Sequence, residues 1–389
     1  MRCGCVVFDE QRPESGWASI EGEPATRIKG LGDLRSDVLW WTSLETTNFY
    51  HSGMSRIANM RNADYLRTPM AALKDEMGIT QRFIEVNKSV SILSEVFSRV
   101  MLLAEMHYGI KQSKQQKLSD DLRTILIPKD VSISEEMDQA CELAYQAFVK
   151  CTKNPGRVKT KNVQFKRNRY QHAMEVLSTP VPGRKFEYVP QHKLPEKSDV
   201  LSWILELDRP VMIQGAVAHV SQAFSNVISF GGGSPHRRGW ITHPEIVALS
   251  EFVHFDVQSL FLFDHYEPIK ANIDPPYVDP GFGMLSISIG LLAENYWVGI
   301  ASPEVGKTNT QKLYSPRVSW LRASDRSLTM IPAMKVHAEG VQVSSYSLGS
   351  VSIDVPYGNL ENVMEIAGGA GLFPPLSSQE DVLIQEGLA

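Results

Sequence analysis

The spacing of apolar residues changes along this chain. In the first half they recur every three or four positions, most clearly between residues 80 and 108, where Gly109 ends the pattern. This period is typical of an amphipathic helix, and glycine is the common residue just past a helix end. A long helix is therefore predicted at 80–108. Its apolar stripe is wide, as expected of a helix central to a bundle or to an assembly contact. The stripe consists of Phe83, Val86, Val90, Leu93, Phe97 and Val100.

Near the C-terminal end the period changes to two. Alternating apolar and polar residues predict seven strands separated by turns. Strands without intervening helical patterns favour an antiparallel sheet or sandwich over a parallel, doubly wound sheet. The seven segments begin at Met284, Tyr296, Arg317, Ser327, Met334, Val341 and Val351.

These two patterns predict an α+β protein, in which an N-terminal helical domain is followed by a C-terminal antiparallel, β-rich and sandwich-like domain. The 389 residues are enough for two cores. We expect an extended arm at 1–33, the helical domain at 34–182, the β-rich domain at 186–375 and an acidic tail at 376–389. No apolar stretch approaches the roughly 20 residues that a membrane helix needs, so no membrane span is predicted.

Charge adds a feature that composition hides. The chain carries a net charge of −5, yet every charged residue in the segment from Lys150 to Arg169 is a cation. A capping box at Ser132 and Glu135 begins a helix that leads into this segment, and Asn154-Pro155-Gly156 interrupts it. The cations are therefore expected to lie on both sides of a turn between two helices. They are Lys150, Lys153, Arg157, Lys159, Lys161, Lys166, Arg167 and Arg169.

Such a concentration of positive charge favours an anionic partner, and phosphate is the commonest one. Phe165 and Tyr170 lie among the cations, where their rings could stack on bases while the cations neutralise phosphates. Arg237 and Arg238 could extend the same nucleic-acid-binding surface. The alternative is a solvated loop with lysines on a helix face and two exposed arginines in a turn.

One motif points to enzyme chemistry. Asp274-Pro275-Pro276-Tyr277 resembles the loop with which N6-adenine methyltransferases hold the target nitrogen, and the glycines after Phe230 resemble their loop for the methyl donor. The resemblance covers those two motifs, and Ser234 stands where the second glycine of the donor loop belongs. It implies S-adenosylmethionine as methyl donor. The alternative interpretation is a rigid Pro-Pro connection between two regions.

No catalytic, cofactor-binding or metal-binding site is predicted beyond that motif. The densest group of possible ligands fits no known metal-ligand spacing, so we expect it to be structural or solvated. The four cysteines form no zinc-type pair, and Cys141 and Cys151 are expected to be buried thiols in one helical pattern, which indicates an intracellular, reducing compartment. A virion is the alternative location if the chain assembles into a shell. The group of possible ligands is His254, Asp256, Asp264, His265 and Glu267.

The wide helix stripe and the basic segment together favour a structural role over an enzymatic one. The leading hypothesis is a self-assembling protein, a virus or phage shell or nucleoprotein-type subunit, that forms homo-oligomers and contacts RNA or DNA through the basic segment. Two alternatives stay open at this point. One is a nucleic-acid N6-adenine methyltransferase that uses the Asp274-Pro-Pro-Tyr loop, and the other is a non-viral nucleic-acid-binding scaffold.

Overall fold

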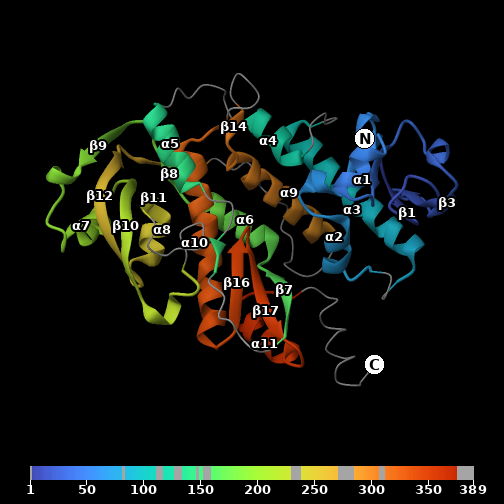
Figure 1. The fold of residues 1–389 in the computed structure, drawn as a ribbon. Coiled ribbons are helices and arrows are strands. Elements are labelled where there is room, and N and C mark those ends of the chain that lie inside the picture. The colour runs from blue at the N-terminus through green and yellow to red at the C-terminus, as the bar shows by residue number, and fades with distance from the viewer. Residues whose placement is uncertain are drawn as a thin grey trace. The chain divides into compact units, whose positions relative to one another are not determined.

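The computed structural model describes residues 2–80, 84–110, 117–126, 134–145, 149–151, 159–228, 238–269, 284–305 and 312–374. Two compact units make up the chain (Figure 1). Unit 1 combines Met1–Lys129 with Asn272–Ile300, and unit 2 combines Asp130–Ala271 with Ala301–Ala389. Each unit is therefore built from two separate stretches of sequence. Among the described residues, no helix is both long and apolar enough to cross a membrane.

Unit 1 is built on a five-stranded sheet in the order β3-β2-β1-β4-β5. The central strand β1 pairs antiparallel with β2 and parallel with β4. All six residues of β1 are buried, because both faces of the sheet are covered. The strands are β1 (Cys3–Phe8), β2 (Gly16–Ile20), β3 (Thr26–Ile28), β4 (Leu39–Thr42) and β5 (Met60–Asn62).

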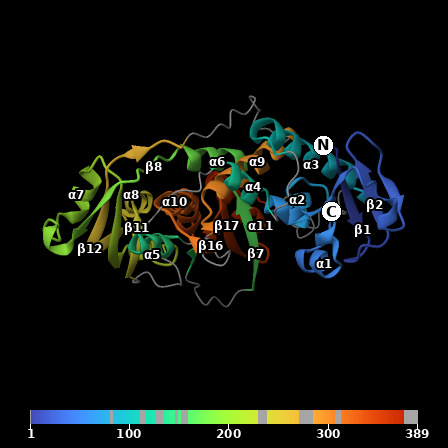
Figure 2. The same ribbon diagram turned by 90° about the horizontal axis from the view of Figure 1, so that it is seen from above.

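The helices of unit 1 complete its core. Helix α3 lies along β1 and β2 (Figure 2), where the ring of Phe97 stacks on Trp41 with centroids 4.6 Å apart. Helix α9 packs against α3 and α4, and a Cβ atom on Gly299 would lie only 2.5 Å from the carbonyl oxygen of Ser119. Glycine therefore permits the close contact of α9 with α4. The helices are α1 (Thr46–His51), α2 (Met70–Glu76), α3 (Val86–Tyr108), α4 (Leu118–Leu126) and α9 (Met284–Ile300).

Unit 2 holds two antiparallel four-stranded sheets, in the orders β11-β10-β12-β9 and β6-β16-β17-β7. Two-stranded pairs β8–β13 and β14–β15 accompany them. The strands of the larger sheets are β6 (Val149–Lys150), β7 (Thr160–Lys166), β9 (Phe186–Pro190), β10 (Val211–Val220), β11 (Arg238–Thr242), β12 (Val253–Phe263), β16 (Gln342–Ser347) and β17 (Ser350–Pro356). The short strands are β8 (Val181–Pro182), β13 (Tyr266–Glu267), β14 (Glu304–Val305) and β15 (Lys312–Leu313).

Helix α10 connects the parts of unit 2, and one continuous apolar core includes residues of both sheets. Ser315 caps the N-terminus of α10, and the helix contacts α5, α6, α8 and β16 (Figure 1). Arg326, buried on α10, donates two hydrogen bonds to Glu245 of α8 at 2.8 and 2.9 Å. The helices are α5 (Glu135–Ala144), α6 (Arg169–Ser178), α7 (Val200–Glu206), α8 (His243–Leu249), α10 (Pro316–Ala338) and α11 (Leu360–Gly369).

The predicted fold class is wrong. Helices and sheets alternate through the chain, so an N-terminal helical domain does not precede a β-rich one. The first 33 residues, expected as an arm, contain β1, β2 and β3. Five of the seven predicted strands fall instead in the long helices α9 and α10, whereas the last two correspond to β16 and β17.

These errors have a common physical cause in burial. A strand covered on both faces, such as β1, shows no alternation of apolar and polar residues. A helix that is buried over most of its surface, such as α10, shows no single apolar stripe. Its Ser324 and Thr329 hydroxyls donate to the carbonyls of Trp320 and Asp325 one turn earlier, so these small polar residues are accommodated inside the core.

Candidate nucleic-acid interface

The sheet β6-β16-β17-β7 has one apolar face and one polar face. Val163, Phe165, Tyr346, Val351 and Ile353 point into the core and are almost fully buried. Their neighbours along each strand point the other way, as strand geometry requires, and all of them are polar. We call this second surface the polar face. It consists of Lys150, Asn162, Gln164, Lys166, Gln342, Ser344, Ser345, Ser347, Ser350, Ser352 and Asp354.

The polar face carries two lysines and a single carboxylate. That carboxylate, Asp354, is buried and accepts a hydrogen bond from Nδ2 of Asn162 at 2.7 Å. The same amide group donates to the hydroxyl of Ser344 at 2.8 Å, across the strand between them. Apart from Asp354, the polar face consists of neutral hydroxyls and amides, with Lys150 and Lys166 on its two edge strands.

The turn of the β16–β17 hairpin is hydrogen-bonded to a buried carboxylate. Leu348 and Gly349 form a two-residue turn with φ of 51° and 64°, the left-handed backbone that tight hairpins require. Their N–H groups donate to Oδ2 and Oδ1 of Asp325 on α10, at 2.9 and 3.1 Å. Thr329 donates a further hydrogen bond to the backbone carbonyl of Asp325. Asp325 therefore fixes the turn relative to the central helix.

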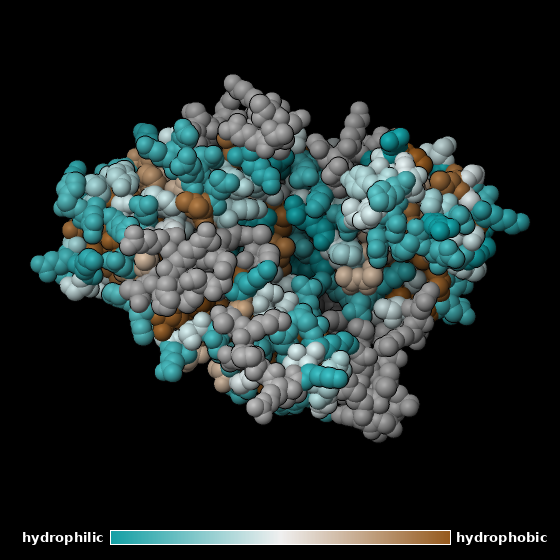
Figure 3. Space-filling model, in the orientation of Figure 1, coloured by the Kyte–Doolittle hydropathy of each residue, from teal (hydrophilic) through white to brown (hydrophobic). Residues whose placement is uncertain are grey.

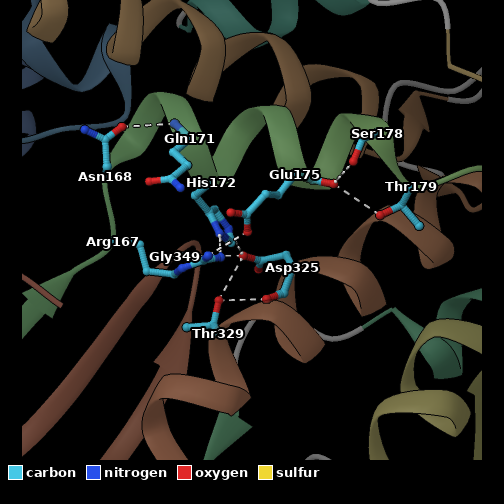
Figure 4. Close-up of polar contacts among 10 residues, drawn as sticks. All are labelled: Arg167, Asn168, Gln171, His172, Glu175, Ser178, Thr179, Asp325, Thr329 and Gly349. Atoms are coloured by element: carbon cyan, nitrogen blue, oxygen red, sulfur yellow. Dashed lines mark hydrogen bonds and ion pairs between the residues drawn. The ribbon is translucent and has the colours of Figure 1, made fainter. Parts of the chain in front are cut away.

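A histidine and an arginine complete this anchor (Figure 4). Nε2 of His172, on α6, lies 2.8 Å from Oδ1 of Asp325, and Nη1 of Arg167 lies 2.7 Å from Nδ1 of the same ring. Arginine can only donate, so Nδ1 accepts and Nε2 carries the proton that is donated to Asp325. Arg167 also donates to Glu175 at 2.6 Å, and its backbone N–H donates to the carbonyl of Gly349 at 2.8 Å.

The pKa of the Asp325 carboxyl reflects its hydrogen bonds. Its side chain is completely buried, which by itself raises the pKa of the carboxyl. The hydrogen bond from His172, the hydrogen bond from the N–H of Leu348 and the charge of Arg322 outweigh burial and hold the pKa below its ordinary value. Asp325 is thus an ionised group whose acceptor sites are occupied by the hairpin turn and His172.

The structure brings part of the predicted basic segment to the edges of this sheet. Lys150 lies on β6, Lys159 and Lys161 lie at the start of β7, and Lys166 ends β7 on the polar face. Arg169 and Tyr170 begin α6 and are half-buried. The predicted turn between two helices is therefore, in its described part, a β-strand that leads into a helix.

The other predicted residues lie elsewhere. Phe165 is in the core with no exposed surface, and Arg167 belongs to the anchor of the hairpin turn. Arg238 begins β11 in the other four-stranded sheet. Lys153, Arg157, Arg237, the glycine loop after Phe230 and the Asp274-Pro-Pro-Tyr loop lie outside the described residues. No three His, Cys, Asp or Glu side chains gather into a metal-binding group in the described part of the chain.

Sequence reasoning missed the serine-rich surface and the anchor. The alternation of serine with valine and isoleucine from Val341 to Val355 predicted strands, but the serines were not considered as a surface of their own. Asp325 and His172 are separated by 153 residues, and each is one of many single polar residues in the sequence. Leu348-Gly349 between two alternating segments was the one local signal for a tight hairpin.

Comparison with solved structures finds a fold similar to that of a DNA polymerase. Phi29 DNA polymerase complexed with primer-template DNA is 12% identical and superposes with a TM-score of 0.50, over 93% of this chain and 82% of that one. The same polymerase in an orthorhombic crystal form gives a TM-score of 0.47 at 11% identity, over 91% and 80% of the two chains. At this identity the likeness is one of fold. No protein family matches the sequence, and no curated protein sequence matches it.

This finding overturns the predicted function. A fold like that of a DNA polymerase over nearly the whole chain is not that of a self-assembling shell or virion subunit, and it does not support the methyltransferase or scaffold alternatives. The physical reason for the error lies in α3. Its wide apolar stripe was interpreted as central either to a bundle or to an assembly contact, and the hypothesis of self-assembly relied on the second; the helix packs against β1, β2 and α9 inside its own unit.

Proposed function

We propose that this chain binds nucleic acid and that the polar face of the β6-β16-β17-β7 sheet is its contact surface. The observation that carries the proposal is the likeness of fold, over 93% of the chain, to a DNA polymerase whose structure holds primer-template DNA. The polar face supports it independently, because hydroxyls, amides and lysines are the groups that contact phosphates and sugars.

The distribution of charge on this sheet favours an anionic backbone. Lys150 on the edge strand β6 and Lys166 at the end of the edge strand β7 both lie on the polar face. Lys159 and Lys161 are exposed at the opposite end of β7, where alternation puts Lys161 on the side of Val163 and Phe165. Between the two lysines the polar face consists of hydroxyls and amides, and its one carboxylate, Asp354, is buried and accepts a hydrogen bond from Asn162. Contacts of this kind position a nucleic acid without reading its sequence. We therefore expect affinity with little sequence preference.

The test is a salt titration of binding. A fluorescently labelled primer-template duplex is titrated with the protein between 50 and 200 mM salt, and the slope of log K against log salt is measured by anisotropy. Each neutralised phosphate contributes roughly −0.7 to −0.9 to this slope. Replacing Lys150 and Lys166, the two lysines of the polar face, by glutamine is expected to flatten the slope by about 1.4 to 1.8 and to weaken all sequences about equally.

A charge-matched control separates a local contact from a general effect of net charge. Lys29→Gln and Lys335→Gln together remove two exposed cations from other surfaces, and this double variant is expected to keep the wild-type slope. Equal slopes for the two double variants would reject the polar face as the contact surface. Absence of binding by the wild-type protein at 50 mM salt would reject the function itself.

Two expectations from the sequence remain proposals alongside this function. Self-association of the 43.5 kDa chain is checked by light scattering with and without nucleic acid. A reducing compartment fits the four cysteines, all of which are buried free thiols.

A further inference from the structure

The second four-stranded sheet of unit 2, β11-β10-β12-β9, carries aromatic rings on one face. Its strand register places Trp240 of β11 and Phe261 of β12 on the same face as Phe186 and Tyr188 of β9. Residues on the opposite face, such as Ile213, Leu260 and Leu262, belong to the core. We call the four rings the aromatic ribbon. It consists of Phe186, Tyr188, Trp240 and Phe261.

The rings of the aromatic ribbon touch one another in sequence across the sheet. Trp240 stacks on Phe261 with centroids 4.7 Å apart and an angle of 15° between their planes. On the other side, Phe186 and Tyr188 lie 5.3 and 5.6 Å from Phe261. Phe261 is only 4% exposed, whereas Phe186 is 39% exposed and Tyr188 is 54% exposed. The ribbon thus rests on a buried central ring and opens to solvent along β9.

Solvent-exposed aromatic rings on an edge strand require an explanation, because leaving two such side chains in water forgoes the burial that usually stabilises them. Figure 3 shows hydrophobic surface among hydrophilic residues over the elements of this sheet. Four-stranded sheets with exposed aromatic rings are one of the general ways in which proteins stack unpaired bases.

The charges around β9 select the kind of partner. Arg184 and Lys185 directly precede the first exposed ring, and Lys193 follows the strand; all three are exposed. Two carboxylates of this sheet are paired with cations, since Glu187 lies 3.3 Å from Arg209 and Asp256 lies 3.1 Å from Lys197. The exposed rings are therefore flanked by cations at both ends, which complements a partner with a negatively charged backbone and flat, apolar faces.

We propose that the aromatic ribbon is a stacking site for single-stranded nucleic acid, with Phe186 and Tyr188 contacting bases and the flanking cations contacting phosphates. The inference rests on the proposed function, to which it adds a second surface and a class of substrate. In a duplex the faces of the bases are already stacked on one another, so only an unpaired strand can offer them to these rings. The ribbon thus favours single strands, and the polar face is not required to do so.

The experiment compares an unstructured 20-nucleotide oligothymidine with a 20-base-pair duplex by fluorescence anisotropy. Tyr188→Ala is expected to weaken binding of the single strand by about 5- to 150-fold, the range found when a base-stacking ring is removed, with the duplex affinity changed less than twofold. Phe186→Ala is expected to act in the same direction. Tyr188→Phe keeps a ring and is expected to restore most of the affinity.

Tyr50→Ala is the matched control, because Tyr50 is 44% exposed but lies on α1 in unit 1. It is expected to leave both affinities unchanged. Single-strand affinity that is retained in the Phe186→Ala and Tyr188→Ala variants would overturn the stacking site while the proposed function stands. An equal loss for single strand and duplex would also overturn it, because a stacking site acts on unpaired bases. Absence of any nucleic-acid binding by the wild-type protein would overturn both proposals.

Discussion

Asp325 and Gly349 are joined by a hydrogen bond of 3.1 Å from the backbone N–H of Gly349 to Oδ1 of the carboxylate. This contact links the middle of a buried helix to the tip of a β-hairpin whose outer surface is the polar face. The same oxygen lies 2.8 Å from Nε2 of His172. The position of the hairpin tip therefore depends on a small number of buried polar groups, and substitutions of these groups are expected to change the free energy of unfolding.

The first prediction concerns the carboxylate itself. Asp325→Ala is expected to lower the free energy of unfolding by about 3 kcal/mol or more, because it removes the acceptor of three buried donors and each unpaired buried donor costs about 1 to 3 kcal/mol. Two hairpin N–H groups and His172 lose their bonds in this variant. Urea unfolding followed by circular dichroism measures the loss. A loss below about 1 kcal/mol, the size of an ordinary hydrogen bond, would contradict the anchoring role.

Gly349 allows a sharper test, because its environment differs from that of a second glycine with a similar backbone. Gly349 has φ of 64°, and a Cβ atom there would lie 2.8 Å from the His172 ring; Gly340 has φ of 80° and open space around it. Gly340→Ala is expected to cost about 1 to 2 kcal/mol for the left-handed backbone alone. Gly349→Ala is expected to cost that amount plus about 1 to 3 kcal/mol for overpacking against His172.

Chemical denaturation of the two variants supplies the comparison. Equal losses of stability in Gly340→Ala and Gly349→Ala would show that His172 moves aside freely, and the packing of the anchor would then be looser than the contact distances indicate. His172→Ala in the Gly349→Ala background is expected to recover the overpacking part of the loss, although it also removes the hydrogen bond to Asp325.

The depressed pKa of Asp325 predicts how stability changes with pH. A carboxyl whose pKa is lower in the folded than in the unfolded protein adds stability above its unfolded pKa, here near 3.8, and that stability is lost as pH falls through the folded pKa. The difference in unfolding free energy between wild type and Asp325→Asn is therefore expected to be constant above about pH 5 and to shrink in more acid solution. Urea unfolding between pH 2.5 and 6 measures it. A difference that grows as pH falls would mean that the folded pKa is raised.

Sequence patterns predicted the elements that have one exposed face. Helix α3 and strands β16 and β17 each bury one side, so their period could be recognised. The central strand β1 and the helices α9 and α10 could not be assigned from period, because β1 is buried on both faces and most residues of the two helices are buried. Where neither face of an element is exposed to water, polar residues do not alternate with apolar ones, and the sequence then shows no period that distinguishes a helix from a strand.

The candidate interface was only partly predictable for a related reason. Local concentration of charge included both lysines of the polar face, Lys150 and Lys166, since a run of cations is visible without knowledge of the fold. The aromatic ribbon joins Tyr188, Trp240 and Phe261 from three strands, and the anchor joins His172 to Asp325 from two helices. Such groups of residues are brought together by long-range strand register and helix packing, which a short stretch of sequence does not predict.

A pair of helical glycines in the two units gives predictions of opposite sign. Gly299→Ala in α9 places a Cβ atom 2.5 Å from the carbonyl oxygen of Ser119 and is expected to destabilise unit 1 by about 1 to 3 kcal/mol through overpacking. Gly368→Ala in α11 meets no atom within 4 Å and is expected to stabilise by about 0.5 to 1 kcal/mol, because alanine favours the helix. Thermal unfolding measures both, and a neutral Gly299→Ala would contradict the close contact of α9 with α4.

The thiols of the chain give the last prediction. Burial raises the pKa of Cys3 to about 11 and those of Cys5 and Cys151 to about 12, and it raises the pKa of Cys141 as well. Only the thiolate reacts with a disulfide reagent, so burial suppresses reaction both by limiting access and by keeping each group protonated. The folded protein at pH 8 is therefore expected to show almost no reaction with Ellman's reagent within minutes.

Unfolding in concentrated urea removes both effects at once. All four cysteines are free thiols, so four equivalents are expected to react rapidly in the unfolded chain, where each pKa returns to its ordinary value near 9.0. A partial count in urea would indicate a disulfide or a modified cysteine. One equivalent reacting quickly in the folded protein would show that a buried strand or helix opens locally, and replacing Cys3, Cys5, Cys141 and Cys151 by serine one at a time would identify it.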